Sequence, residues 1–83
     1  MSNIEKIAEY RSLLRNVLFG LYCNGDIDMS DKGKYANEIN DIKTMVDVVS
    51  TLRRFLGIAK MDTIEYLQLQ KISIKLINLG YVI

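Results

Sequence analysis

The amino-acid sequence predicts an all-α protein with a single domain, residues 1–83. The predicted architecture is a small three-helix bundle, or a helical hairpin with a third helix packed on it. Apolar residues recur at the three- and four-residue spacing of amphipathic helices over most of the chain. Proline, which interrupts helices, is absent. Turn-forming residues at 24–33 and a short break near residues 60–61 divide the chain into three helical segments.

The first predicted helix extends from about residue 3 to residue 22. Ser2 followed by Glu5 has the spacing of a capping box, in which both side chains bind free backbone amides at a helix start. Asn24 and Gly25 end the helix, and a polar loop follows as far as residue 33. The expected buried face consists of Ile4, Ile7, Leu14, Leu18 and Leu21, with Tyr10, Leu13 and Val17 beside them.

The second predicted helix is one continuous rod over residues 35–59 with two apolar edges. Such a helix must be covered by two neighbours. In so short a chain this predicts self-association, with a dimer favoured. The first edge, which Arg53 interrupts, is Tyr35, Ile39, Ile42, Val46, Val49 and Leu56. The second edge is Met45, Val48, Leu52, Phe55 and Ala59.

The third predicted helix begins near Asp62 and Glu65, which have the spacing of a second capping box. Leu69, Ile72, Leu76 and Leu79 continue at helical spacing. The alternative is a short strand pair, because residues 72, 74 and 76 are apolar and alternate with polar ones, and residues 78–80 have the composition of a turn.

Charge is unevenly distributed along the chain, although the net charge is only +1. Residues 24–50 carry six acidic and three basic groups, whereas residues 51–83 carry five basic and two acidic ones. Antiparallel packing would place Arg11 near Asp41 or Asp47, and Lys71 and Lys75 along the acidic first half of the middle helix. Internal neutralisation of this kind argues against a general nucleic-acid binder.

Catalytic chemistry is not expected. The chain has no histidine, the commonest proton-transfer group near neutral pH. The single cysteine, Cys23, has no activating neighbour and is expected to be a packing residue. A single cysteine cannot form an internal disulfide, so we expect a cytoplasmic location, in a cell or an infected host. No segment approaches the roughly 18 apolar residues that cross a bilayer, so no membrane partner is expected.

The polar loop contains an alternating series of oxygen ligands, Asp26, Asp28 and Ser30, like the start of a calcium-binding loop. The glycine and the final glutamate of that pattern are missing. We therefore expect no metal and no cofactor, and we expect Asp28 or Ser30 to cap the following helix.

Two arginines, Arg11 and Arg53, interrupt apolar stripes, where a charge must be paired or bind an anion. The structural interpretation is that they set the packing register with acidic partners. The functional interpretation is an anion or partner contact formed by Tyr10, Arg11, Arg15, Arg53 and Arg54. The structural interpretation is favoured, because an arginine can also reach solvent along its aliphatic stem.

Residues 7–11 (Ile-Ala-Glu-Tyr-Arg) and 54–60 (Arg-Phe-Leu-Gly-Ile-Ala-Lys) resemble segments of the phage anti-CBASS sponges, small helical oligomers that sequester cyclic nucleotides. The turn at residues 24–25 departs from those proteins, which continue a long helix at this place. The resemblance implies an anionic nucleotide ligand, with Tyr10 stacking on a base and arginines binding phosphates.

The sequence as a whole predicts a non-enzymatic helical interaction protein. We expect a small regulator or inhibitor, encoded by a phage or another mobile element, that self-associates and binds a protein partner. An oligomeric nucleotide sponge is the alternative. A DNA-binding regulator is the second alternative, since Arg53 and Arg54 suit a phosphate backbone, but no clear helix-turn-helix is present.

Overall fold

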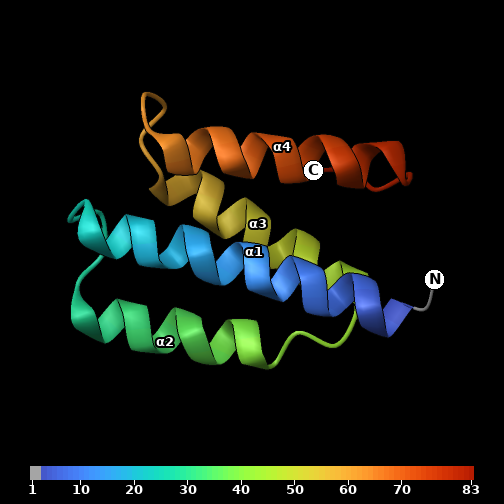
Figure 1. Cartoon of the computed structure of the whole chain (residues 1–83), viewed down its shortest axis with the longest axis horizontal. Helices are drawn as coiled ribbons and strands as arrows, with labels where there is room; N and C mark the ends of the chain where they lie inside the picture. The colour runs from blue at the N-terminus through green and yellow to red at the C-terminus, as the bar shows by residue number, and fades with distance from the viewer. Residues whose placement is uncertain (1–2) are drawn as a thin grey trace.

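The computed structural model describes residues 3–83, which form four α-helices and no β-strand. The helices are α1 (Asn3–Cys23), α2 (Met29–Asn40), α3 (Met45–Ile58) and α4 (Ile64–Asn78). Successive helices run in opposite directions (Figure 1). The predicted all-α class is confirmed. The alternative strand pair is wrong, because its first proposed strand belongs to a continuous α4 and no strand forms in the described range.

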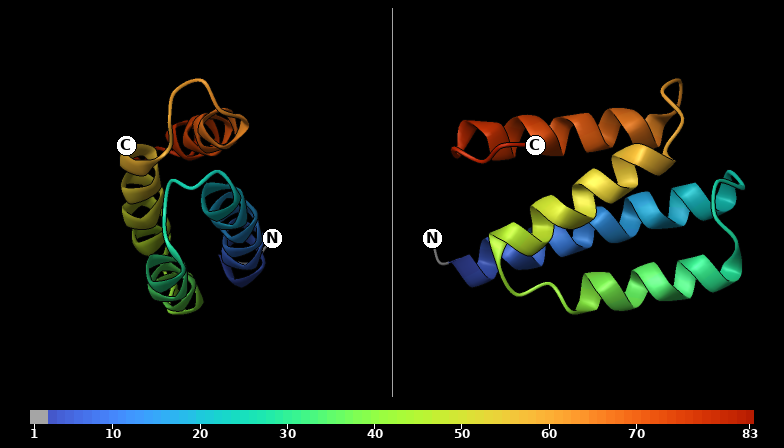
Figure 2. Two further views of the ribbon diagram at one scale, coloured as in Figure 1. Left: turned by 90° about the vertical axis from the view of Figure 1, so that its left-hand side faces the viewer. Right: turned by 180° about the vertical axis from the view of Figure 1, so that it is seen from behind.

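The central helix of the fold is α1, which packs against α2, α3 and α4. Figure 1 shows α2 and α4 on opposite sides of α1, and the reverse view in Figure 2 shows α3 crossing α1 obliquely. α3 also packs against α4. All four helices contribute fully buried side chains to one core, among them Leu14, Leu21, Ile39, Val48, Leu52, Phe55, Leu69 and Leu76.

The end of α1 lies one residue beyond the predicted boundary. Gly25 has a φ of 80°, its N–H donates to the Tyr22 carbonyl (3.1 Å), and the Asp26 N–H donates to the Leu21 carbonyl (2.9 Å). This pattern is a Schellman motif, in which glycine takes a left-handed conformation without steric cost. The predicted buried face is confirmed except at Leu13, which is partly buried, and at Ile4, which is exposed. Ser2 of the predicted capping box lies outside the described residues.

The loop after α1 is shorter than predicted, because α2 already begins at Met29. Asp28 is the N-cap of α2, as one of the two sequence alternatives stated, and its Oδ1 accepts from the Asp31 N–H at 2.8 Å. A carboxylate at this position satisfies a backbone amide that has no partner within the helix. The polar stretch therefore serves mainly as a helix start.

The predicted continuous rod over residues 35–59 is wrong, because α2 ends at Asn40 and α3 starts at Met45. Thr44 has an extended backbone and caps α3: its Oγ1 accepts from the Asp47 N–H at 3.2 Å. Asp47 Oδ2 in turn accepts from the backbone N–H groups of Lys43 (3.0 Å) and Thr44 (3.1 Å). This capping box stabilises a new helix start without proline or glycine.

The break divides the first predicted edge and leaves the second intact. Met45, Val48, Leu52, Phe55 and Ala59 are all buried. Of the first edge, Ile39, Ile42 and Val49 are buried, Tyr35 and Leu56 are partly buried, and Val46 is 66% exposed. α3 does cover two neighbours, but they are α1 and α4 of the same chain. The two edges therefore no longer argue for self-association.

We expect Thr44→Ala to lower the free energy of unfolding by about 1 kcal/mol, because the Asp47 amide loses its acceptor. Urea unfolding followed by circular dichroism measures the change. Ser50→Ala, at an exposed position of the same helix, is the matched control and should change stability by less than about 0.5 kcal/mol. Equal losses in the two variants would contradict the capping role.

The same cap predicts a dependence of stability on pH. Hydrogen bonds from the backbone amides of Lys43 and Thr44, and from the Thr44 side chain, hold the pKa of Asp47 below its ordinary value. A carboxylate whose pKa is lower in the folded state than in the unfolded state stabilises the fold at any pH above the unfolded-state pKa. This stabilisation is lost as the pH falls through the folded-state pKa. Asp47→Asn should therefore flatten the fall in urea midpoint below about pH 4. Parallel pH profiles for the variant and the parent would argue against this cause.

The chain turns back onto the bundle after α4. Gly80 has a φ of 100°, and the N–H groups of Gly80 and Tyr81 donate to the carbonyls of Ile77 (2.9 Å) and Leu76 (3.0 Å), which forms a second Schellman motif. Tyr81 and Ile83 then pack against the core. The segment after the turn covers core side chains instead of forming a strand.

Candidate interaction surface

The arginines of α1 hold the turn between α2 and α3. Arg11 Nη1 donates to the Ile42 carbonyl at 3.3 Å, and Arg15 Nη2 donates to Asn40 Oδ1 at 2.7 Å. The carbonyl of Ile42 follows the end of α2, where carbonyl groups have no partner within the helix. Arg11 thus lies beside the segment that contains Asp41 and Asp47, as predicted, but its hydrogen bond is to a main-chain carbonyl instead of to either carboxylate.

The arginines of α3 also have partners within the chain. Arg53 Nη2 donates to the Val82 carbonyl at 2.8 Å and so fixes the segment after α4. Arg54 Nη1 lies 3.2 Å from Glu38 Oε2, and Thr51 Oγ1 donates to Glu38 Oε1 at 3.3 Å. These contacts support a structural role for the arginines. The acidic partners expected for Arg11 and Arg53 are replaced by main-chain carbonyls, and the arginine that pairs with a carboxylate is Arg54.

Tyr10 does not lie with the arginines as an exposed platform. Its side chain belongs to the core and is 6% exposed. Burial, together with the negative charge of Glu9 and the proximity of Tyr81, raises the pKa of the Tyr10 phenol. Stacking of a ligand base on this ring would require the ring to leave the core.

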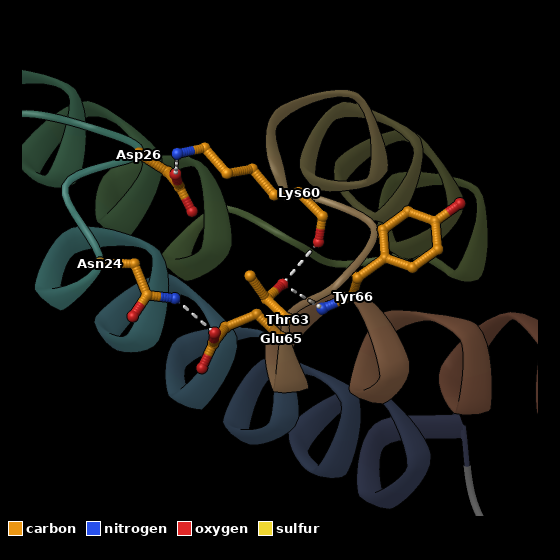
Figure 3. Close-up of polar contacts among 6 residues, drawn as sticks. All are labelled: Asn24, Asp26, Lys60, Thr63, Glu65 and Tyr66. Carbon is orange, nitrogen blue, oxygen red and sulfur yellow. Dashed lines mark hydrogen bonds and ion pairs between the residues drawn. The ribbon is translucent and has the colours of Figure 1, made fainter.

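A group of polar contacts joins the end of α1 to the start of α4 (Figure 3). Asn24 Nδ2 donates to Glu65 Oε1 at 2.5 Å. Lys60 Nζ lies 3.7 Å from Asp26 Oδ1. The Asp26 side chain is only 3% exposed, and its Oδ2 accepts no hydrogen bond from the part of the chain that the structure describes.

The cap of α4 differs from the predicted pair of residues 62 and 65. Thr63 Oγ1 accepts from the Tyr66 N–H at 3.2 Å and donates to the Lys60 carbonyl at 2.6 Å. The polar contacts in Figure 3 therefore connect the turn after α1 to the turn before α4 and stabilise the fold there.

The remaining candidate groups do not form a catalytic or metal centre. Cys23 is exposed, contrary to the expectation of a packing residue, because it lies two residues beyond the buried Leu21 and points to another side of α1. Within residues 3–83, no three histidine, cysteine or acidic side chains lie close enough to hold a metal ion.

Exposed apolar side chains concentrate on α4. Leu67, Ile74 and Ile77 are between 51% and 58% exposed and lie on the side of α4 opposite its buried residues; we call these three residues the outer face of α4. The large side chains exposed at its ends and adjoining turns are Met61, Ile64, Leu79 and Val82. None of the helices in residues 3–83 is long and apolar enough to cross a membrane.

A groove between α1 and α4 adjoins this face. It has a volume of about 200 Å³ and an apolar floor that includes the buried Val17 and Ile72. Lys71 and Lys75 stand at its α4 side. The residues that define this α1–α4 groove are Leu13, Asn16, Val17, Gln68, Lys71, Ile72 and Lys75.

The predicted position of the two lysines is wrong. Lys71 and Lys75 were expected along the acidic first half of the middle helix, but α2 and α4 lie on opposite sides of α1 (Figure 1). Lys75 Nζ instead lies 3.8 Å from Glu9 Oε1 of α1, and both side chains are more than half exposed. Lys71 makes no ion pair or hydrogen bond with residues 3–83. Their positive charge is therefore only partly neutralised.

Sequence reasoning missed this surface, although a signal was present. Leu67, Ile74 and Ile77 are apolar in addition to the face formed by Leu69, Ile72 and Leu76. A helix with more apolar residues than one buried face requires has an exposed apolar side.

Comparison with protein-family models, with curated proteins and with solved structures found no match.

Proposed function

We propose that the protein is a non-enzymatic helical interaction protein, a small regulator or inhibitor that binds a protein partner through α4. The observation that carries the proposal is the outer face of α4, with Leu67, Ile74 and Ile77 exposed on one helix. Exposed apolar side chains that gather on one side of a helix are typical of a binding site, because leaving them in water is unfavourable.

Self-association stays a prediction, but the continuous helix over residues 35–59 from which it was predicted does not form. The apolar edges of residues 35–59 are largely covered by α1 and α4 within the chain. A different protein is therefore the favoured partner of α4. Sedimentation velocity at increasing concentration distinguishes the two cases, because only self-association raises the sedimentation coefficient.

The two alternatives receive less support. The arginines of the proposed anion site already bind the chain itself, and the Tyr10 ring is buried. The exposed side of α4 carries leucine and isoleucine, which suit a protein better than the polar edges of DNA bases.

The proposal is tested by placing a photo-crosslinking residue at Gln70, an exposed position on α4, and at Asn37, an exposed position on α2. We expect crosslinks to another protein from Gln70 and few from Asn37. Adding Ile74→Ser should remove the Gln70 crosslinks without unfolding the protein, because Ile74 is 58% exposed. Crosslinks that are equal at both positions, or unaffected by Ile74→Ser, would contradict binding through α4.

A further inference from the structure

We propose that the α1–α4 groove binds an acidic amphipathic helix of the protein partner. This inference rests on the proposed function and adds the chemistry of the ligand. Three features carry it: the apolar floor of the groove, the lysines at its edge and the neighbouring outer face of α4.

The floor supplies the apolar contact. Val17 and Ile72 are almost fully buried in the groove floor, and Leu13 beside them is partly buried. A hollow of about 200 Å³ between two helices is large enough for one or two aliphatic side chains of a bound segment. Binding of an amphipathic helix in a groove commonly uses such anchors at three- and four-residue spacing.

The edge of the groove supplies the charge. Lys71 has no partner among residues 3–83, and Lys75 has only the exposed carboxylate of Glu9. A second hollow, which shares Lys75 and extends towards Leu79, also contains Lys6. The residues that line the two hollows include three lysines and one glutamate, an excess of positive charge that favours a negatively charged ligand.

The lysine and apolar positions also form one continuous surface. Lys71 follows Leu67 by four residues and precedes Ile74 by three, so the three side chains are neighbours on α4. A bound helix can therefore place leucine-like side chains on Leu67 and Ile74 and carboxylates on Lys71. The apolar and the charged contact are then one helical turn apart on α4.

A second copy of this chain fits the groove poorly. Pairing two identical grooves about a two-fold axis would bring lysines against lysines. The acidic surface of α2 is the other candidate, but Met29 is the only exposed large apolar residue on that helix. It therefore offers carboxylates without the apolar anchors that the groove floor requires.

The test uses two synthetic peptides of about 20 residues, a length that forms a helix. One has leucines at helical spacing flanked by glutamates, and the other has glutamine in place of every glutamate. Fluorescence anisotropy with labelled peptide measures binding to the whole protein. We expect saturable binding of the glutamate peptide and much weaker binding of the glutamine peptide.

Variants then locate the contact. Lys71→Glu should weaken binding of the glutamate peptide about tenfold, because it removes an attraction and adds a repulsion. Lys34→Glu makes the same charge change on an exposed position of α2 and should leave binding unchanged. Circular dichroism confirms that both variants fold.

Several outcomes would overturn the inference: no saturable binding up to about 1 mM peptide, equal weakening by both lysine variants, or equal binding of the two peptides. Lys71-dependent binding to vesicles containing phosphatidylserine, without peptide binding, would assign the surface to an anionic membrane instead. If crosslinking from Gln70 persists in Lys71→Glu, the proposed function stands and the acidic-helix inference fails.

Discussion

Replacing Phe55 with alanine is expected to lower the free energy of unfolding by about 3–5 kcal/mol. The Phe55 side chain is fully buried on α3, and its ring meets the Tyr35 ring of α2 edge to face, with centroids 5.6 Å apart. The substitution removes this contact and leaves a cavity in the core. A domain of this size has a total stability of roughly 4–12 kcal/mol, so the substitution removes a large part of it.

Phe19→Ala is the matched control, because Phe19 is 60% exposed on α1. It should change stability by less than about 1 kcal/mol. Urea unfolding measures both variants, and Phe55→Leu, which keeps much of the buried volume, provides a value if Phe55→Ala does not fold. Similar losses at Phe19 and Phe55 would show that the assignment of the core is incorrect.

Lys60→Met is expected to lower the free energy of unfolding by about 1–3 kcal/mol, although the Lys60 side chain itself is largely exposed. The reason is Asp26: its side chain is 3% exposed, and its one charged partner among residues 3–83 is Lys60 Nζ at 3.7 Å. A buried carboxylate without a counter-ion carries the full cost of its desolvation. Methionine preserves the length and the apolar stem of the lysine.

The cause can be isolated with a second substitution. Adding Asp26→Asn to Lys60→Met should recover part of the lost stability, because no unpaired buried charge remains. Lys34→Met, at an exposed lysine without an ion pair in residues 3–83, should change stability by less than about 0.5 kcal/mol. If Lys60→Met and Lys34→Met are indistinguishable, the ion pair contributes nothing measurable.

Much of the fold follows from local patterns in the sequence. The apolar spacing of residues 7–21 and the pair Asn24 and Gly25 predict α1 and its end, because helix periodicity and glycine C-caps are local properties. The break at Thr44 was missed because the apolar period continues through it. The spacing of Thr44 and Asp47 was the available signal, since a capping box starts a helix even where no glycine or proline is present.

The interaction surface was less predictable. Periodicity identifies which residues of α4 are apolar but not which neighbours cover them, and coverage depends on how α2 and α4 are placed around α1. The splitting of the middle segment moved the acidic residues of α2 away from Lys71 and Lys75 (Figure 1). The exposed lysines are thus a consequence of tertiary arrangement, which a single sequence does not specify.

The central position of α1 also has a consequence for biosynthesis. α1 is the first of the four helices to leave the ribosome, yet α4, one of the helices that cover it, is the last. The contacts between α1 and α4 join residues far apart in the chain, and such contacts form late because a long loop must close first. Until then the part of α1 that α4 covers is open to chaperones and to other nascent chains.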